Sequence, residues 1–208
     1  MLILSLDSAG TGCSACVWRD GKVIATADER MERGQDQRLM PMIMGVMQKA
    51  GIAFPSLNRI AVTRGPGSFT GIRIGLAAAR GVGLAAEKLA VGIDRFAIYR
   101  AQIETPGKNL LAIIDSKRKE LFCRFYPVQG LPTEPCMMTP DEIAAFLTKH
   151  RNTICAGDAK VAGIDMLPPS EIEAVTAARL AAEADPADPA FLPRPLYIRA
   201  PDVTMRAS

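Results

Sequence analysis

The chain has 208 residues, of which 49% are hydrophobic and 23% charged, and its mean hydropathy is +0.12. This composition excludes an intrinsically disordered protein and is typical of one domain or two small lobes with a packed core. The formal net charge of +3 is compatible with RNA contact but does not require it, and the basic run Lys117-Arg118-Lys119 is typical of a solvated turn.

Targeting and redox signals point to a cytoplasmic protein. The amino terminus has no basic lead and reaches an acid early, at Asp7, and no apolar run is long enough to span a membrane. Five cysteines, an odd count, argue against a secreted disulfide framework. Cys13 and Cys16 lie three apart in a predicted strand, so their side chains should point to opposite faces and hold neither a metal nor a disulfide.

The first half of the chain predicts alternating strands and helices. Asp20-Gly21 is a strong hairpin signal, Asp36 is a candidate helix cap, and Pro41 should lie near the first turn of its helix. The predicted elements are a strand over 2–6, hairpin strands over 13–19 and 22–29, a helix over 38–50, a strand over 59–63, a helix over 72–86, a strand over 89–93 and a helix over 96–103.

Pro106-Gly107 interrupts this pattern and predicts a boundary between two lobes, residues 1–104 and 105–208. The second half then begins again with strands. Its predicted elements are strands over 110–115 and 120–126, a helix over 141–149, a strand over 152–156, a helix over 176–184 and a last short strand over 196–198.

A glycine-rich stretch, Gly65 to Gly75, joins a predicted strand to a predicted helix. Ser68 and Thr70 can cap that helix, and its free amides suit a phosphate, a carboxylate or a partner's backbone. The stretch lacks the Lys of a P-loop, the G-x-G-x-x-G spacing of a dinucleotide site and the first glycine of a nucleophile elbow. A purely structural strand-to-helix turn therefore remains an equal alternative.

Five segments, in order along the chain, carry a family resemblance: Ile3 to Ala9, Gln37 to Ile43, Gly65 to Gly75, Ala112 to Ser116 and Pro195 to Arg199. On these the chain resembles the TsaB family of bacterial tRNA threonylcarbamoyladenosine biosynthesis proteins, which are inactive relatives of TsaD. The resemblance implies a two-lobed α/β fold of the actin/hexokinase/Hsp70-like (ribonuclease H-like) type, with mixed sheets flanked by helices and a second lobe that repeats the first.

The resemblance also implies a function. It predicts a non-catalytic scaffold that binds TsaD, and with it the ATPase TsaE, to support threonylcarbamoyl transfer to the adenosine adjacent to the anticodon of tRNAs that read codons beginning with A. Alone, such a chain would form a homodimer and bind no cofactor, with a nucleotide at the TsaD interface left open. It would contact tRNA only through the assembled complex.

Residue chemistry agrees with a scaffold. TsaD binds its metal through a pair of histidines on one helix, whereas this chain has a single histidine, His150, in a polar segment, so we expect no catalytic and no metal-binding residues. Two alternatives stay open. An autonomous small-molecule kinase or ATPase of the same fold has one candidate acid, Asp115, but lacks a second glycine-rich phosphate turn. A glycoprotease-like peptidase would need a constellation that we cannot assemble.

Two sets of residues are candidate sites. In active relatives the turn after the first strand holds a nucleotide phosphate, so this turn and the glycine-rich stretch are nucleotide-proximal or structural: Asp7, Ser8, Thr11, Gly67, Ser68 and Thr70. The Met-rich helix is apolar around much of its circumference, which predicts a partner surface against the small residues of the next helix. This interface set is Leu39, Met40, Ile43, Met44, Met47, Ile72, Gly75, Leu76 and Ala79.

Overall fold

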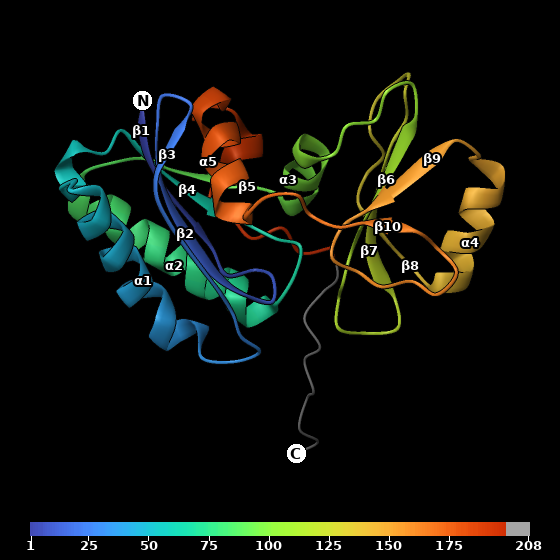
Figure 1. The fold of residues 1–208 in the computed structure, drawn as a ribbon, viewed down its shortest axis with the longest axis horizontal. Helices are drawn as coiled ribbons and strands as arrows, with labels where there is room; N and C mark the ends of the chain where they lie inside the picture. Colours follow the sequence, from blue (N-terminus) through green and yellow to red (C-terminus); the bar gives the residue numbers. More distant parts are fainter. Residues whose placement is uncertain (199–208) are drawn as a thin grey trace, which may run out of the picture.

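A computed structural model describes residues 1–198 as two five-stranded mixed sheets with flanking helices (Figure 1). The first sheet has the order β3-β2-β1-β4-β5, in which β1 is antiparallel to β2 and parallel to β4. Its strands are β1 (Leu2–Asp7), β2 (Gly12–Arg19), β3 (Lys22–Arg30), β4 (Arg59–Thr63) and β5 (Ala90–Ile93).

The second sheet repeats this pairing in the order β10-β9-β6-β7-β8, with β6 antiparallel to β7 and parallel to β9. The predicted two-lobed α/β fold, with a second lobe that repeats the first, is confirmed. The strands of this sheet are β6 (Asn109–Ile114), β7 (Leu121–Tyr126), β8 (Cys136–Met138), β9 (Thr153–Ala156) and β10 (Met166–Leu167).

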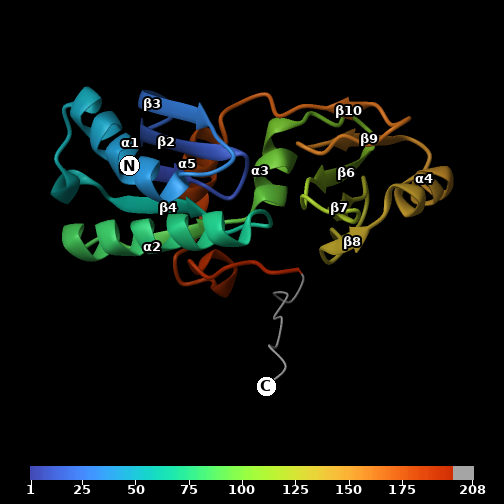
Figure 2. The same cartoon turned by 90° about the horizontal axis from the view of Figure 1, so that it is seen from below.

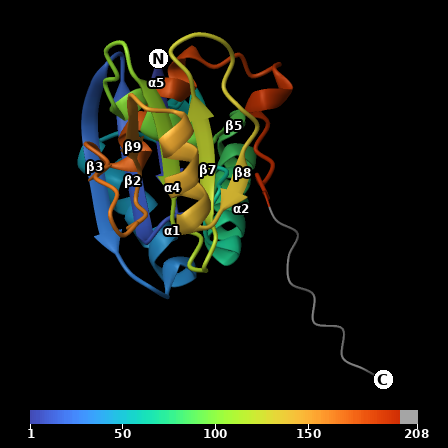
Figure 3. The same ribbon diagram turned by 90° about the vertical axis from the view of Figure 1, so that its right-hand side faces the viewer.

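Helices cover both faces of the first sheet. In Figure 2, α1 and α2 lie on one face and α5 on the other, with α3 between the two sheets; Figure 3 shows α4 in front of the second sheet. The helices are α1 (Gln35–Ala50), α2 (Phe69–Ala86), α3 (Arg95–Gln102), α4 (Pro140–Lys149) and α5 (Glu173–Glu183), and two 3-10 helices are η1 (Phe54–Ser56) and η2 (Pro189–Phe191). None of the helices within residues 1–198 is long and apolar enough to cross a membrane.

The side chains of β1 point alternately to the two faces of the sheet, so the core of the first lobe consists of two clusters. Leu2, Leu4 and Leu6 pack with α1 and α2, whereas Ile3 packs with α3 and α5. The second cluster also contains Ala112 and other residues of the second sheet. One hydrophobic core therefore joins the two lobes through α3 and α5.

Most predicted elements are present, with shifted ends. The hairpin is confirmed, and its turn residues Asp20 and Gly21 have φ of 46° and 88°, the positive values that a tight hairpin turn needs. Ser68 caps α2 by accepting a hydrogen bond from Gly71 N, and Thr70 lies inside the helix. Asp36 was wrong as a cap, since α1 begins at Gln35 after a left-handed Gly34.

Four further details differ from expectation. Pro41 lies inside α1 rather than in its first turn, so the helix lacks one backbone hydrogen bond there. The short strands β8 and β10 carried no sequence signal. Residues 196–198 form no strand; instead they run beside α2, with Leu196 N bonded to Arg64 O. Arg199, the end of the last resemblance segment, lies outside the described residues, as do 200–208.

The expected division into residues 1–104 and 105–208 stays a prediction. Around that boundary the structure has an irregular link from α3 to β6. The chain then builds the second sheet and crosses back, because α5 packs on β1, β2 and β4 of the first sheet. The first sheet is therefore covered by a helix from the second half of the sequence.

Candidate functional site

The carboxyl ends of β1 and β4 meet beside the junction of the lobes, and Asp7 and Thr63 end these two parallel strands. Asp7 Oδ1 accepts hydrogen bonds from Ala9 N at 3.1 Å and from the Thr63 hydroxyl. Asp7 is buried, and burial, together with the nearby Glu173 carboxylate, raises its pKa to about 7. Its visible role is to cap the turn that follows β1.

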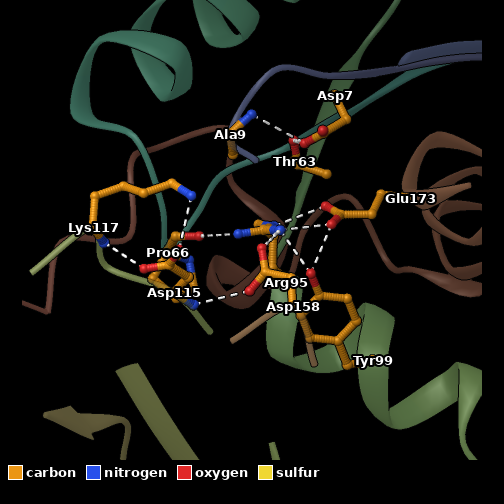
Figure 4. Close-up of polar contacts among 10 residues, drawn as sticks. All are labelled: Asp7, Ala9, Thr63, Pro66, Arg95, Tyr99, Asp115, Lys117, Asp158 and Glu173. Atoms are coloured by element: carbon orange, nitrogen blue, oxygen red, sulfur yellow. Dashed lines mark hydrogen bonds and ion pairs between the residues drawn. The ribbon is translucent and has the colours of Figure 1, made fainter. Parts of the chain in front are cut away.

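Beside Asp7, Arg95 at the start of α3 carries a guanidinium that is only 1% exposed. It makes a two-pronged ion pair with Glu173 of α5, from Nε to Oε2 at 2.8 Å and from Nη2 to Oε1 at 2.6 Å (Figure 4). Nη2 also donates to Asp158 Oδ2 of the second lobe at 2.8 Å and to the Tyr99 hydroxyl at 2.7 Å. A single buried charge thus connects α3, α5 and the second lobe.

Two more contacts extend this network, which we call the Arg95 network. Arg95 Nη1 donates to Pro66 O in the glycine-rich turn at 3.2 Å, and Asp158 Oδ1 accepts from Asp115 N at 2.9 Å. Burial acts to raise the pKa of Asp158, but the Arg95 guanidinium, the hydrogen bond from Asp115 N and the nearby Lys117 together outweigh it, and the pKa is lowered. Asp158 is therefore held as a carboxylate across the lobe junction.

Sequence reasoning missed Arg95, Tyr99, Asp158 and Glu173. The four residues come from three segments, and Arg95 and Glu173 are 78 positions apart in the sequence. No local pattern marks a buried ion pair at such a separation. The one available signal was an arginine at the first position of the helical segment Arg95 to Gln102.

The two turns expected near a nucleotide pack directly on each other. Ser68 N donates to Ala9 O at 2.9 Å, and Ser8 Oγ donates to Gly71 O at 2.8 Å. A Cβ on Gly67 would lie 2.1 Å from Ala9 O, and one on Gly71 would lie 2.0 Å from Ser8 O. These contacts leave no space for a phosphate between the two turns.

A cleft of about 860 Å³ opens between the lobes beside the Arg95 network. Asp7, Asp158 and Glu173 line it, and Thr11 lies at its exposed rim. The lining contains five carboxylates, the other two being Asp28 and Glu171, against the two basic residues Arg30 and Lys160. Phosphate binding would therefore meet like charge. No cluster of residues suited to a metal ion occurs in the described part of the chain.

The expected partner interface is divided by the fold into buried and exposed residues. Leu39, Ile43 and Met47 of α1 and Ile72, Gly75, Leu76 and Ala79 of α2 are buried inside the first lobe. Met40 and Met44 lie outside, with 42% and 55% of their surface exposed. A partner can reach these two methionines, whereas the buried residues hold α1 and α2 on the sheet.

The exposed positions around Met40 and Met44 are mostly uncharged. The other exposed positions between residues 37 and 48 of α1 are Gln37, Arg38, Pro41 and Gln48, of which only Arg38 is charged. On the neighbouring α2, Leu84 is 84% exposed. Gly45 of α1 and Gly81 of α2 have open space where a side chain would stand. We call this surface the helical face, defined by Met40, Met44, Gly45, Gly81 and Leu84.

The family model for TsaD, tRNA N6-adenosine threonylcarbamoyltransferase, matches residues 27–146. The TsaB protein of Escherichia coli strain K12, named a tRNA threonylcarbamoyladenosine biosynthesis protein, is 35% identical over 128 residues, 61% of this chain and 55% of the relative. The TsaB protein of Haemophilus influenzae is 30% identical over 125 residues, 59% of this chain and 52% of the relative.

The matched region spans about half the length of these curated relatives. A solved structure of YeaZ from Pseudomonas aeruginosa has the same fold, with a TM-score of 0.71 at 23% identity, covering 94% of this chain and 99% of that one. The family model covers more than half of the 208 residues. The chain therefore belongs to the TsaD family, the family of tRNA N6-adenosine threonylcarbamoyltransferase, and within it is similar to the TsaB proteins.

Proposed function

We propose that this chain is a non-catalytic subunit in the biosynthesis of threonylcarbamoyladenosine in tRNA, and that it binds TsaD through the helical face. The observation that carries the proposal is this exposed, mostly uncharged surface across α1 and α2, with the methionines Met40 and Met44 at its centre. Exposed apolar surface of this kind usually marks a site of protein–protein contact. Methionine side chains adapt readily to a partner, and glycines leave room for one. The pathway is proposed from the similarity to TsaB proteins.

The lobe junction supports a role without chemistry. In the Arg95 network, the guanidinium and the carboxylates of the lobe junction are paired with one another. The two turns that would hold a phosphate contact each other directly. We propose that the chain alone binds no cofactor, that a nucleotide binds at its junction with TsaD, and that TsaE joins the pair. In the absence of TsaD, the helical face would bind a second copy of the chain.

Size-exclusion chromatography with light scattering tests the proposal. The full chain is mixed with TsaD as wild type, as Met44→Asp and as Val128→Asp. Met44 and Val128 are 55% and 54% exposed, but Val128 lies on the second lobe, so it is a matched control. Wild type and Val128→Asp should form a complex, whereas Met44→Asp should remain folded and lose it, because a carboxylate would be desolvated at the interface.

Retention of the complex by Met44→Asp would contradict the proposed surface. Met47→Asp is not a useful variant, because Met47 is 2% exposed and the change would disrupt the core. The kinase alternative is tested separately by ATP turnover of the isolated chain, which the scaffold proposal predicts to be at background level.

A further inference from the structure

A second surface lies on the opposite side of α2 from α1. Residues 192–198, which we call the strap, run beside α2 (Figure 2). Three contacts hold the strap there: Leu196 N to Arg64 O at 2.8 Å, Arg80 Nη2 to Pro193 O at 2.5 Å, and Arg73 Nε to the Tyr197 hydroxyl at 3.1 Å. The strap and α2 thus form one continuous surface.

Charge on this surface is mainly positive, with Glu87 at its edge, where Glu87 lines a pocket together with Arg80, Leu192 and Pro193. Residues 64–86 contain three arginines, and the strap contains a fourth, Arg194, while neither segment contains Asp, Glu or Lys. The whole chain is nearly balanced, with 25 basic and 22 acidic residues, so this local excess is not a reflection of composition.

The charges of the four arginines are not neutralised within the described chain. No carboxylate of residues 1–198 forms an ion pair with Arg64, Arg73, Arg80 or Arg194. Arg73 and Arg80 donate hydrogen bonds to uncharged oxygens, and Arg64 Nε is buried with no acceptor among the described residues. Guanidinium groups in this state suit an anion that accepts several hydrogen bonds, above all phosphate.

Aromatic rings accompany the arginines. The Arg73 guanidinium lies 3.8 Å from the centre of the Phe69 ring, and the Phe69 and Tyr197 rings are 4.9 Å apart. Arg73 is exposed, and Tyr197 is 37% exposed. Nucleic-acid-binding proteins use such guanidinium planes and aromatic rings to stack unpaired bases beside a phosphate backbone. An acidic protein would be matched by the charge but would not need these planar groups.

We infer that the strap and α2 form a contact surface for RNA, through which this chain contributes directly to tRNA binding in the assembled complex. The inference rests on the proposed function for the identity of the RNA. Arg194 and Arg80 would contact phosphates, and the Arg73, Phe69 and Tyr197 group would stack on an unpaired base. Leu84 of the helical face borders this surface, because it lines a pocket with Arg80 and Pro193, whereas Met40 and Met44 on α1 stay available to TsaD.

The test measures labelled tRNA binding to the complex of the full chain with TsaD by fluorescence anisotropy, at several salt concentrations. Variants are Arg194→Gln, whose exposed side chain forms no hydrogen bond or ion pair with residues 1–198, and Arg73→Gln/Arg194→Gln, with Arg151→Gln on the second lobe as control. The double variant should weaken binding about tenfold and reduce the slope of log affinity against log salt by about 0.7–0.9 per arginine.

Light scattering of each complex separates the possible outcomes. Unchanged affinity and salt slope in a variant that still binds TsaD would overturn the inference. Loss of TsaD binding by Arg194→Gln would also overturn the inference, because it would show that TsaD occupies the surface. If the wild-type chain forms no complex with TsaD, the proposed function fails first and this inference falls with it.

Discussion

Asp7 and Arg95 are buried in the same region, but a change of pH should affect them differently. Arg95 is paired with two carboxylates, so its charge is compensated inside the protein. Asp7 receives only hydrogen bonds from Ala9 and Thr63. Ionisation of Asp7 therefore adds a third negative charge to a site that holds one positive charge.

Replacing Asp7 with Asn should remove a pH dependence from stability. Burial raises the pKa of folded Asp7 from 3.8 to about 7, so its contribution to stability is full below the unfolded pKa and is lost as pH rises through the folded pKa. The free energy of unfolding of the wild type, minus that of Asp7→Asn, should fall from about pH 4 to about pH 7. Urea unfolding at a series of pH values measures this difference.

Asp185→Asn serves as the control for this comparison. Asp185 is exposed and makes the same kind of turn hydrogen bond, to Ala187 N at 2.9 Å, so it reports the loss of a surface carboxylate. A difference between wild type and Asp7→Asn that is constant with pH would show that Asp7 is ionised in the folded protein throughout this range.

At the scale of elements, α2 contains one glycine that has no room for a side chain and another that has ample room. Gly71 allows the helix to approach the turn after β1, where a Cβ would lie 2.0 Å from Ser8 O, whereas Gly81 faces open space. Gly71→Ala should lower the free energy of unfolding by about 3 kcal/mol through overpacking. Gly81→Ala should raise it by about 0.5–1 kcal/mol, because alanine favours the helix. Chemical denaturation of both variants checks this, and equal effects would contradict the proposed close packing.

Local chemistry explains which elements could be predicted. The hairpin at Asp20-Gly21 and the cap at Ser68 depend on a few adjacent residues, and both are present. β8 and β10 are three and two residues long, too short for alternation to show, and they form because a neighbouring strand is already in place. The Arg95 network likewise arises only when distant segments meet. Candidate turns could therefore be named in advance, but not the ion pair that joins them.

The whole molecule should unfold as one unit. One hydrophobic cluster combines residues of both sheets with α3 and α5, and the Arg95 network crosses the same junction. Trp18, the only tryptophan in the sequence, lies in that cluster on the first sheet. Its fluorescence and the far-UV circular dichroism of the whole chain should therefore change at the same urea concentration. Two separate midpoints would show that the lobes unfold independently.

The return of α5 to the first sheet also bears on how the protein is made. A ribosome produces β1 to β5 early, but the face of that sheet beneath α5 can be covered only after residue 183 has left the exit tunnel. Until then, Ile3, Ala61 and Val91 lack the helix that covers them in the finished fold. The nascent first sheet is thus a natural substrate for chaperones that hold exposed apolar surface, and the arrival of α5 ends that dependence.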